Sequence, residues 1–140
     1  MPVTDEHVAA LRAQLAGNHE EHKRLLRELD AAGGMRDYMG LVSAAFLEAV
    51  DRRFKDASLP AAVIEWISDV RAQSDAASQA INPSIAERVI LKALGHGDIA
   101  DISGGDVRHV MRVLLPILIA DEHLGDADLD GFLAAARKLA

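Results

Sequence analysis

Three aspartates at alternate positions near the C-terminus have the spacing of the first ligands of a calcium loop. Residues 125–131 read GDADLDG. Asp126, Asp128 and Asp130 would take positions one, three and five of an EF-hand loop. Position twelve, where such a loop requires a bidentate glutamate, is Arg137. We therefore interpret the segment as the start of a helix, with Asp126 as its N-cap and the other two aspartates in its first turn.

Two histidines one helical turn apart could share a transition metal. The segment NHEEH, residues 18–22, places His19 and His22 where both reach one ion if a third ligand comes from elsewhere. The segment lacks the HExxH spacing of zinc hydrolases, and its two glutamates point to other faces of the helix. His22 falls on the apolar stripe, which favours a hydrogen-bonded histidine between helices with His19 solvated beside it. Metal binding by this pair is kept as an alternative function.

Residues 87–114 read as a helix, a short connection and a second, capped helix. The second part resembles the turn and recognition helix of bacterial repressors, in which Arg108, His109 and Arg112 would face the major groove of DNA. The connection carries aspartates that would lie beside the phosphates and weaken binding. The second helix also continues into the apolar run VLLPILIA, which must be buried. A DNA-binding regulator is therefore a further alternative, and we do not expect nucleic acid to be the partner.

Acidic residues are concentrated between positions 98 and 130, where eight of them stand against two arginines. This stretch includes the entry and the exit of the apolar helix expected there. If the two ends come together in space, they form a negative surface that attracts a basic protein. The alternative is that these acids cap helices and solubilise the chain. The residues predicted to bind a partner are Asp98, Asp101, Asp121, Glu122, Asp126 and Asp128.

Length and composition favour one helical domain spanning residues 1–140. Half of the residues are hydrophobic, but few are aromatic, and much of the apolar content is alanine and leucine. Cysteine is absent, which excludes disulfides and thiolate chemistry. The N-terminal residues MPVTDEHVAALRAQL do not resemble a secretory signal, and the longest apolar run is far shorter than the roughly 20 residues that span a bilayer. We expect a cytoplasmic protein without membrane contact.

The elements that must position these side chains are five to six amphipathic helices in a compact bundle. The stretch 104–121 is apolar on nearly every side from Val113 onward and is expected to be the central helix. Thr4, Asn82 and Ser103 are expected N-caps. The apolar stripe from Val8 onward stays in phase across Gly17, so one kinked helix is favoured over two. The expected helices cover about 4–32, 35–55, 58–80, 83–94, 104–121 and 126–139.

Residues 119–139, IADEHLGDADLDGFLAAARKL, resemble the A-D-x-x-I-x-x-x-E helix-turn segments of tellurite-resistance B-type domains, which are small all-α proteins. The similarity covers about a seventh of the chain. Glu122 stands where a glycine usually follows the first aspartate. The resemblance therefore implies an all-α fold and carries no functional residue over to this chain.

Motifs for catalysis are missing from the sequence. The glycine pairs lack the Lys-Ser or Lys-Thr of a phosphate loop, and no nucleophile motif surrounds a serine. We therefore expect a non-enzymatic module without a cofactor that binds a basic protein through its acidic surface, as an adaptor or an antidote does. Whether copies of the chain associate with one another is left open.

Overall fold

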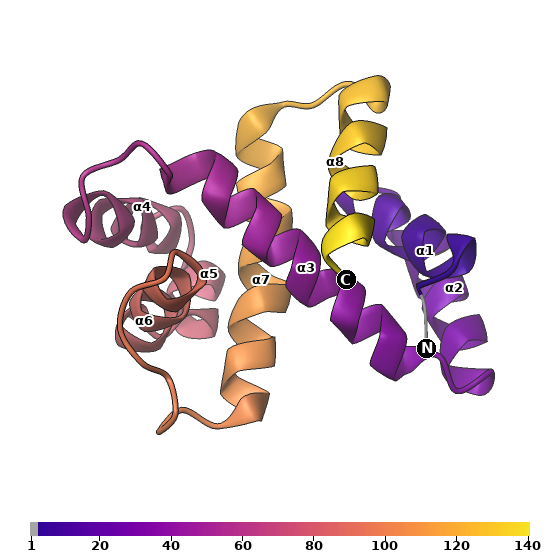
Figure 1. Cartoon of the computed structure of the whole chain (residues 1–140), viewed down its shortest axis with the longest axis horizontal. Coiled ribbons are helices and arrows are strands. Elements are labelled where there is room, and N and C mark those ends of the chain that lie inside the picture. The colour runs from indigo at the N-terminus through magenta and orange to yellow at the C-terminus, as the bar shows by residue number, and fades with distance from the viewer. Residues whose placement is uncertain (1–2) are drawn as a thin grey trace.

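The computed structural model describes residues 3–140, and this part of the chain forms eight α-helices and no strand (Figure 1). The helices are α1 Asp5–Leu15, α2 His19–Ala31, α3 Met35–Phe54, α4 Ala61–Arg71, α5 Asp75–Ala80, α6 Pro83–Ala93, α7 Gly104–Glu122 and α8 Asp126–Leu139. The predicted all-α class is confirmed. The predicted number of five to six helices is wrong.

The extra helices arise because two of the expected helices are each divided. Gly17 adopts φ 82, a left-handed conformation that ends α1, and the Asn18 side chain accepts the N–H three residues on at 3.3 Å to begin α2. The single kinked helix was the wrong choice because the apolar stripe continues in phase across this break. The third expected helix stops at Arg71, and Ser74 caps the short α5 with a hydrogen bond of 3.0 Å.

Figure 1 shows α3 and α7 crossing near the centre of the molecule, with α1, α2 and α8 on one side and α4, α5 and α6 on the other. The bounds of α7 agree with the expected 104–121 within one residue. However, α3 buries more side chains than α7 does, because it packs against α1, α2, α6, α7 and α8. The centre of the bundle is therefore the α3–α7 pair rather than α7 alone.

One cluster of buried apolar side chains draws on every helix except α5. Phe46, Phe54 and Phe132 are fully buried in it, and the ring of Phe54 meets Trp66 edge-on with centroids 5.9 Å apart. Burial of each such side chain contributes about 1.5–3 kcal/mol. This cluster holds the ends of α7 in place relative to α1, α3, α4 and α8.

The expected N-caps are confirmed at the ends that matter for the acidic stretch. Asn82 and Ser103 accept the backbone N–H three residues on at 3.1 Å each, which begins α6 and α7. At the first helix the Thr4 N–H donates to His7 Nδ1 at 2.9 Å, and His7 Nε2 lies 3.1 Å from the carbonyl oxygen of Gly34. His7 thereby joins the start of α1 to the start of α3.

Candidate functional site

The six carboxylates predicted to bind a partner divide into two groups at opposite ends of α7. Asp98 and Asp101 precede the helix, and we call them the α6–α7 acidic group. Asp121, Glu122, Asp126 and Asp128 lie at its end and in the start of α8, and we call them the α7–α8 acidic group. A helix of this length rises about 27 Å. Because α7 separates the two groups by this length, they do not come together into one surface, contrary to the expectation.

The α6–α7 acidic group is bound by the chain itself. Arg88 on α6 donates to both carboxylate oxygens of Asp101, at 3.0 and 2.5 Å, and to the backbone carbonyl of Asp98 at 2.7 Å. The Asp98 side chain accepts the N–H of Ala100 at 2.9 Å. The hydrogen bond from Arg88 lowers the pKa of Asp101 below its ordinary value. These two acids act as parts of a turn.

In the α7–α8 acidic group, the two acids on α7 accept hydrogen bonds from other helices. Trp66 Nε1 on α4 donates to Asp121 at 3.0 Å. Arg52 on α3 donates to one oxygen of Glu122 from Nε and Nη2, at 3.1 and 2.8 Å. These bonds fix the end of α7 while leaving the Asp121 side chain exposed.

The acids on α8 face solvent. Arg12 on α1 lies 3.6 Å from Asp126 and donates to Asp130 at 2.7 Å. The Asp126 side chain is still 96% exposed, and the structure gives Asp128 no ion pair within residues 3–140. Five carboxylates thus gather at this end with only two arginines placed against them. The local charge is negative and accessible.

A hollow of about 210 Å³ opens beside Asp126 of the α7–α8 acidic group, and its lining combines aliphatic side chains with a surface that is more polar than apolar. Its walls come from the end of α1, the end of α7 and the start of α8, and Asp126 lies among them. Aliphatic side chains with a carboxylate beside them match a lysine or arginine side chain, which has an aliphatic stem and a charged head. The lining residues that matter to this match are Leu15, Ile119, His123, Leu124, Asp126 and Leu129.

His123 shapes this hollow by ending α7 in a left-handed conformation. Its φ and ψ are 52° and 47°, and its N–H donates to the carbonyl of Ala120 at 3.2 Å. Left-handed backbone is unfavourable for a residue with a side chain and is found most often at helix ends and functional sites. The turn directs Leu124 back beside α1 and α7, where it completes the wall.

The segment GDADLDG starts α8, as predicted, but the cap residue differs. Gly125 occupies the N-cap position and Asp126 is the first helical residue, with Asp128 in the same turn. Arg137 donates to Asp5 at 2.7 Å and to the carbonyl of Val3 at 3.0 Å. A helix runs through the whole segment, so its aspartates do not form a calcium loop.

The histidine pair on α2 divides between solvent and an interhelical contact. His19 is exposed at the first position of α2, whereas His22 Nδ1 donates to the carbonyl of Ala10 on α1 at 2.8 Å. This confirms the hydrogen-bonded interpretation of His22. Within residues 3–140 no group of three or more histidine, aspartate or glutamate side chains could hold a metal ion.

The three residues of the repressor-like alternative lie near the start of α7. Arg108 and Arg112 are exposed one turn apart, while His109 Nε2 donates to the carbonyl of Ala80 at 2.8 Å. From Val110 onward α7 buries one face against the core. DNA binding stays a prediction, and the packing of α7 gives it no added support.

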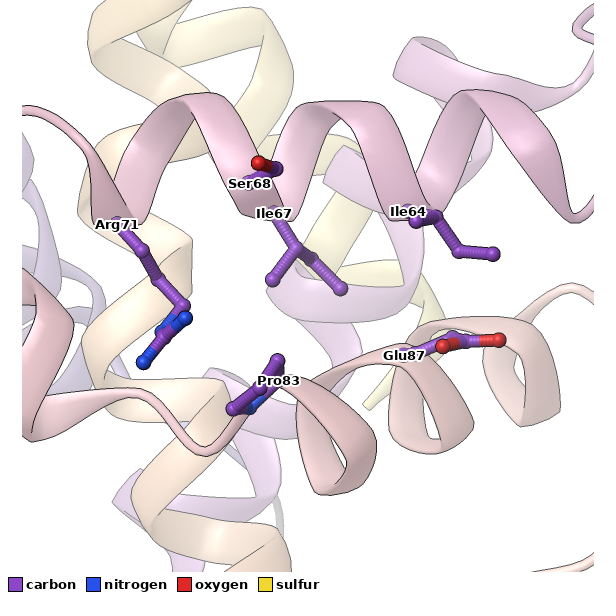
Figure 2. Close-up of a pocket in the computed structure, with 6 residues that line it drawn as sticks. All are labelled: Ile64, Ile67, Ser68, Arg71, Pro83 and Glu87. Carbon is purple, nitrogen blue, oxygen red and sulfur yellow. The ribbon is translucent and has the colours of Figure 1, made fainter.

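A smaller groove between α4 and α6 has a volume of about 160 Å³ (Figure 2). Figure 2 shows Ile67 and Pro83 facing each other across it, with Arg71 at one end. Arg71 donates to the carbonyl of Ile81 at 2.9 Å and to Ser78, so its charge holds the link between α5 and α6. Glu87 lines the other end of the groove and is half-buried, so the groove holds one carboxylate rather than the group of carboxylates found at the α7–α8 end.

The sequence indicated the acids of this end but not the hollow. Leu15 ends α1, whereas His123 and Leu124 are consecutive residues after α7, and no spacing in the sequence relates the first to the other two. The available signal was the apolar Leu124 directly after the end of a helix, where a hydrophobic contact commonly accompanies a left-handed turn.

No family model, curated protein or solved structure matches this chain. The helices of residues 3–140 also lack the combination of length and apolar character that crossing a bilayer requires.

Proposed function

We propose that this chain is a non-enzymatic protein-binding module that receives a lysine or arginine side chain of a basic partner at the α7–α8 end. The role is that of an adaptor or an antidote that covers a basic surface. The observation that carries this proposal is the hollow beside Asp126, since its aliphatic side chains offer contact to the stem of a long cationic side chain and its polar surface and carboxylate offer contact to the charged head.

Charge at this end supports the same partner class. Asp121, Asp126 and Asp128 are exposed, and Asp126 remains 96% exposed although Arg12, which donates to Asp130, also lies 3.6 Å from it. Carboxylates in this arrangement attract a basic surface over several ångströms and discriminate against an acidic one. An exposed ion pair alone contributes little, so contact with the lining of the hollow supplies the specificity.

The experiment is an NMR titration with a short lysine-rich peptide and with the same peptide carrying acetylated lysines. We expect the lysine peptide to shift the methyl signals of Ile119, Leu124 and Leu129, which line the hollow. The acetylated peptide should cause no such shifts because it keeps the length and loses the charge. Binding should also weaken as salt concentration rises.

Two double variants with the same change in net charge provide the comparison. Asp126→Asn with Asp128→Asn should weaken binding of the lysine peptide by about tenfold. Asp98→Asn with Asp101→Asn, at the far end of α7, should leave it nearly unchanged. Equal weakening by both pairs, or equal binding of the acetylated peptide, would show only long-range attraction and would refute a site at the α7–α8 end.

A further inference from the structure

A second cavity, of about 190 Å³, lies between α1, α2, α3 and α7. Its walls combine apolar side chains with polar groups that come from all four helices. The apolar residues are Leu26, Met35, Met39 and Val42, and the polar ones are Gln14, His22, Tyr38 and Arg112. This composition, mostly apolar with a few convergent polar groups, is typical of a small-molecule site.

Tyr38, which lines this cavity, carries an unsatisfied polar atom. The residue is only 3% exposed, and its hydroxyl is buried without a hydrogen-bond partner among residues 3–140. Buried polar side-chain atoms are nearly always paired, so an exception calls for an explanation. A ligand in the cavity that accepts a hydrogen bond would provide the missing partner.

The charge nearest to this hydroxyl is positive. Arg112 lines the same cavity, and its side chain is exposed on α7. Burial raises the pKa of Tyr38, and the charge of Arg112 acts on it in the opposite direction. The hydroxyl therefore remains protonated at neutral pH and can donate, as can the guanidinium. Two donors, one of them cationic, suit an anionic oxygen ligand.

His22 gives the cavity a fixed wall. Its Nδ1 donates to the carbonyl of Ala10 at 2.8 Å, and its ring centroid lies 6.4 Å from that of Tyr38. This bond holds the imidazole in place. Met35 and Met39 are flexible and polarisable, so they adapt to ligands of different shape.

We propose that this cavity binds a small carboxylic acid with an apolar body, whose carboxylate accepts hydrogen bonds from the Tyr38 hydroxyl and Arg112. The body would pack against Leu26, Met39 and Val42. The cavity is somewhat larger than the roughly 150 Å³ that accommodates benzene, so the ligand has about ten non-hydrogen atoms. This binding site is separate from the proposed protein-binding end and does not depend on it.

The probes are benzoate and hexanoate, with benzamide as a neutral control of the same shape as benzoate. In the full chain we expect at least one of the two carboxylates to shift the methyl signals of Met39 and Val42, with a dissociation constant on the order of 1 mM or lower. Benzamide should bind about tenfold more weakly because it lacks the charge.

Three variants assign the polar contacts. Tyr38→Phe and Arg112→Gln should each weaken binding of the carboxylate by about tenfold. Arg108→Gln is the matched control, since it removes the same charge one turn earlier on α7 and does not line the cavity. Tyr38→Phe should also melt at the same or a higher temperature, because its hydroxyl has no partner to lose.

Three results would overturn the proposal. The first is the absence of any methyl shift with both carboxylates at concentrations on the order of 10 mM. The second is equal binding of benzamide and benzoate, or equal weakening by Arg108→Gln and Arg112→Gln. The third is a melting temperature for Tyr38→Phe several degrees below that of the parent chain, which would show that the hydroxyl has a structural role.

Discussion

The two ends of α7 carry the same kind of side chain but form different surfaces. Before the helix, Asp98 and Asp101 are held by Arg88, and no hollow adjoins them among the cavities described above. After the helix, Asp126 of the α7–α8 acidic group lines a hollow, and the carboxylates of this group on α8 remain in solvent. Similar acidic residues thus stabilise a turn at one end and form an accessible surface at the other.

The difference teaches that the neighbours of a carboxylate, rather than the number of carboxylates, decide what it can do. A bidentate arginine satisfies Asp101 within the chain, which leaves little for a partner to gain. Asp126 lines a hollow that also contains aliphatic side chains, where a partner gains both charge and contact. Three changes test this contrast, in order of decreasing effect.

The largest effect is expected from truncating Leu129, a buried side chain that lines the hollow. Leu129 is 4% exposed and belongs to the buried cluster, so Leu129→Ala should lower the free energy of unfolding by about 3 kcal/mol. Ile102, at the other end of α7, is half-buried and lies outside that cluster. Ile102→Ala should lower the free energy of unfolding by about 1 kcal/mol.

Urea denaturation of both variants measures these losses in the free energy of unfolding. An unchanged slope of this free energy against urea concentration would show that the unfolded states are comparable. Equal losses for the two substitutions would contradict the contrast, because the two ends of α7 would then rest on equally buried apolar contacts.

A smaller effect concerns the left-handed residues that end the helices. His123 ends α7 at φ 52 and Gly95 follows α6 at φ 89. His123→Gly should stabilise the chain by about 0.5 kcal/mol, since the strain removed slightly exceeds the added entropy of the unfolded state. Gly95→Ala should destabilise it by about 1 kcal/mol.

Thermal unfolding compares these two variants, and the decisive result is the sign of the change in stability of each one. A destabilised His123→Gly would mean that the imidazole makes contacts worth more than the strain of its backbone. The lysine-peptide titration on the same variant then tells whether the shape of the hollow depends on this side chain.

Much of the fold was predictable where one residue decides a local structure. Asn82 and Ser103 cap the helices they were expected to cap, and α7 has the expected bounds. The break at Gly17 was missed because the apolar stripe is in phase on both sides of it. The central place of α3 was missed because alanines such as Ala45 and Ala49 are apolar but small, and only packing on several sides reveals their burial.

The candidate site was predictable in part. The separation of the two acidic groups followed from the expected length of 104–121 alone, since a helix of that length holds its ends about 27 Å apart. The hollow depends on Leu15 from α1 meeting Leu124 after α7, and such contacts between distant segments have no signature in spacing. The charge was visible in the sequence, whereas the hollow beside it required the structure.

The smallest effect is a change in the titration of Asp101. Arg88 lowers the pKa of this carboxyl through its hydrogen bond, so Arg88→Gln should raise the pKa toward its ordinary value. Because the folded pKa lies below the unfolded one, the ion pair stabilises the fold above about pH 4, and this contribution is lost as pH falls through the folded pKa. Carboxyl-detected NMR measures the midpoint of the Asp101 titration directly.

Arg12→Gln, which removes an arginine from the α7–α8 end instead, should leave the midpoint of the Asp101 titration unchanged. A midpoint that stays unchanged in Arg88→Gln would show that the α6–α7 acids are not held by Arg88, and the contrast between the two ends would then reduce to the hollow alone.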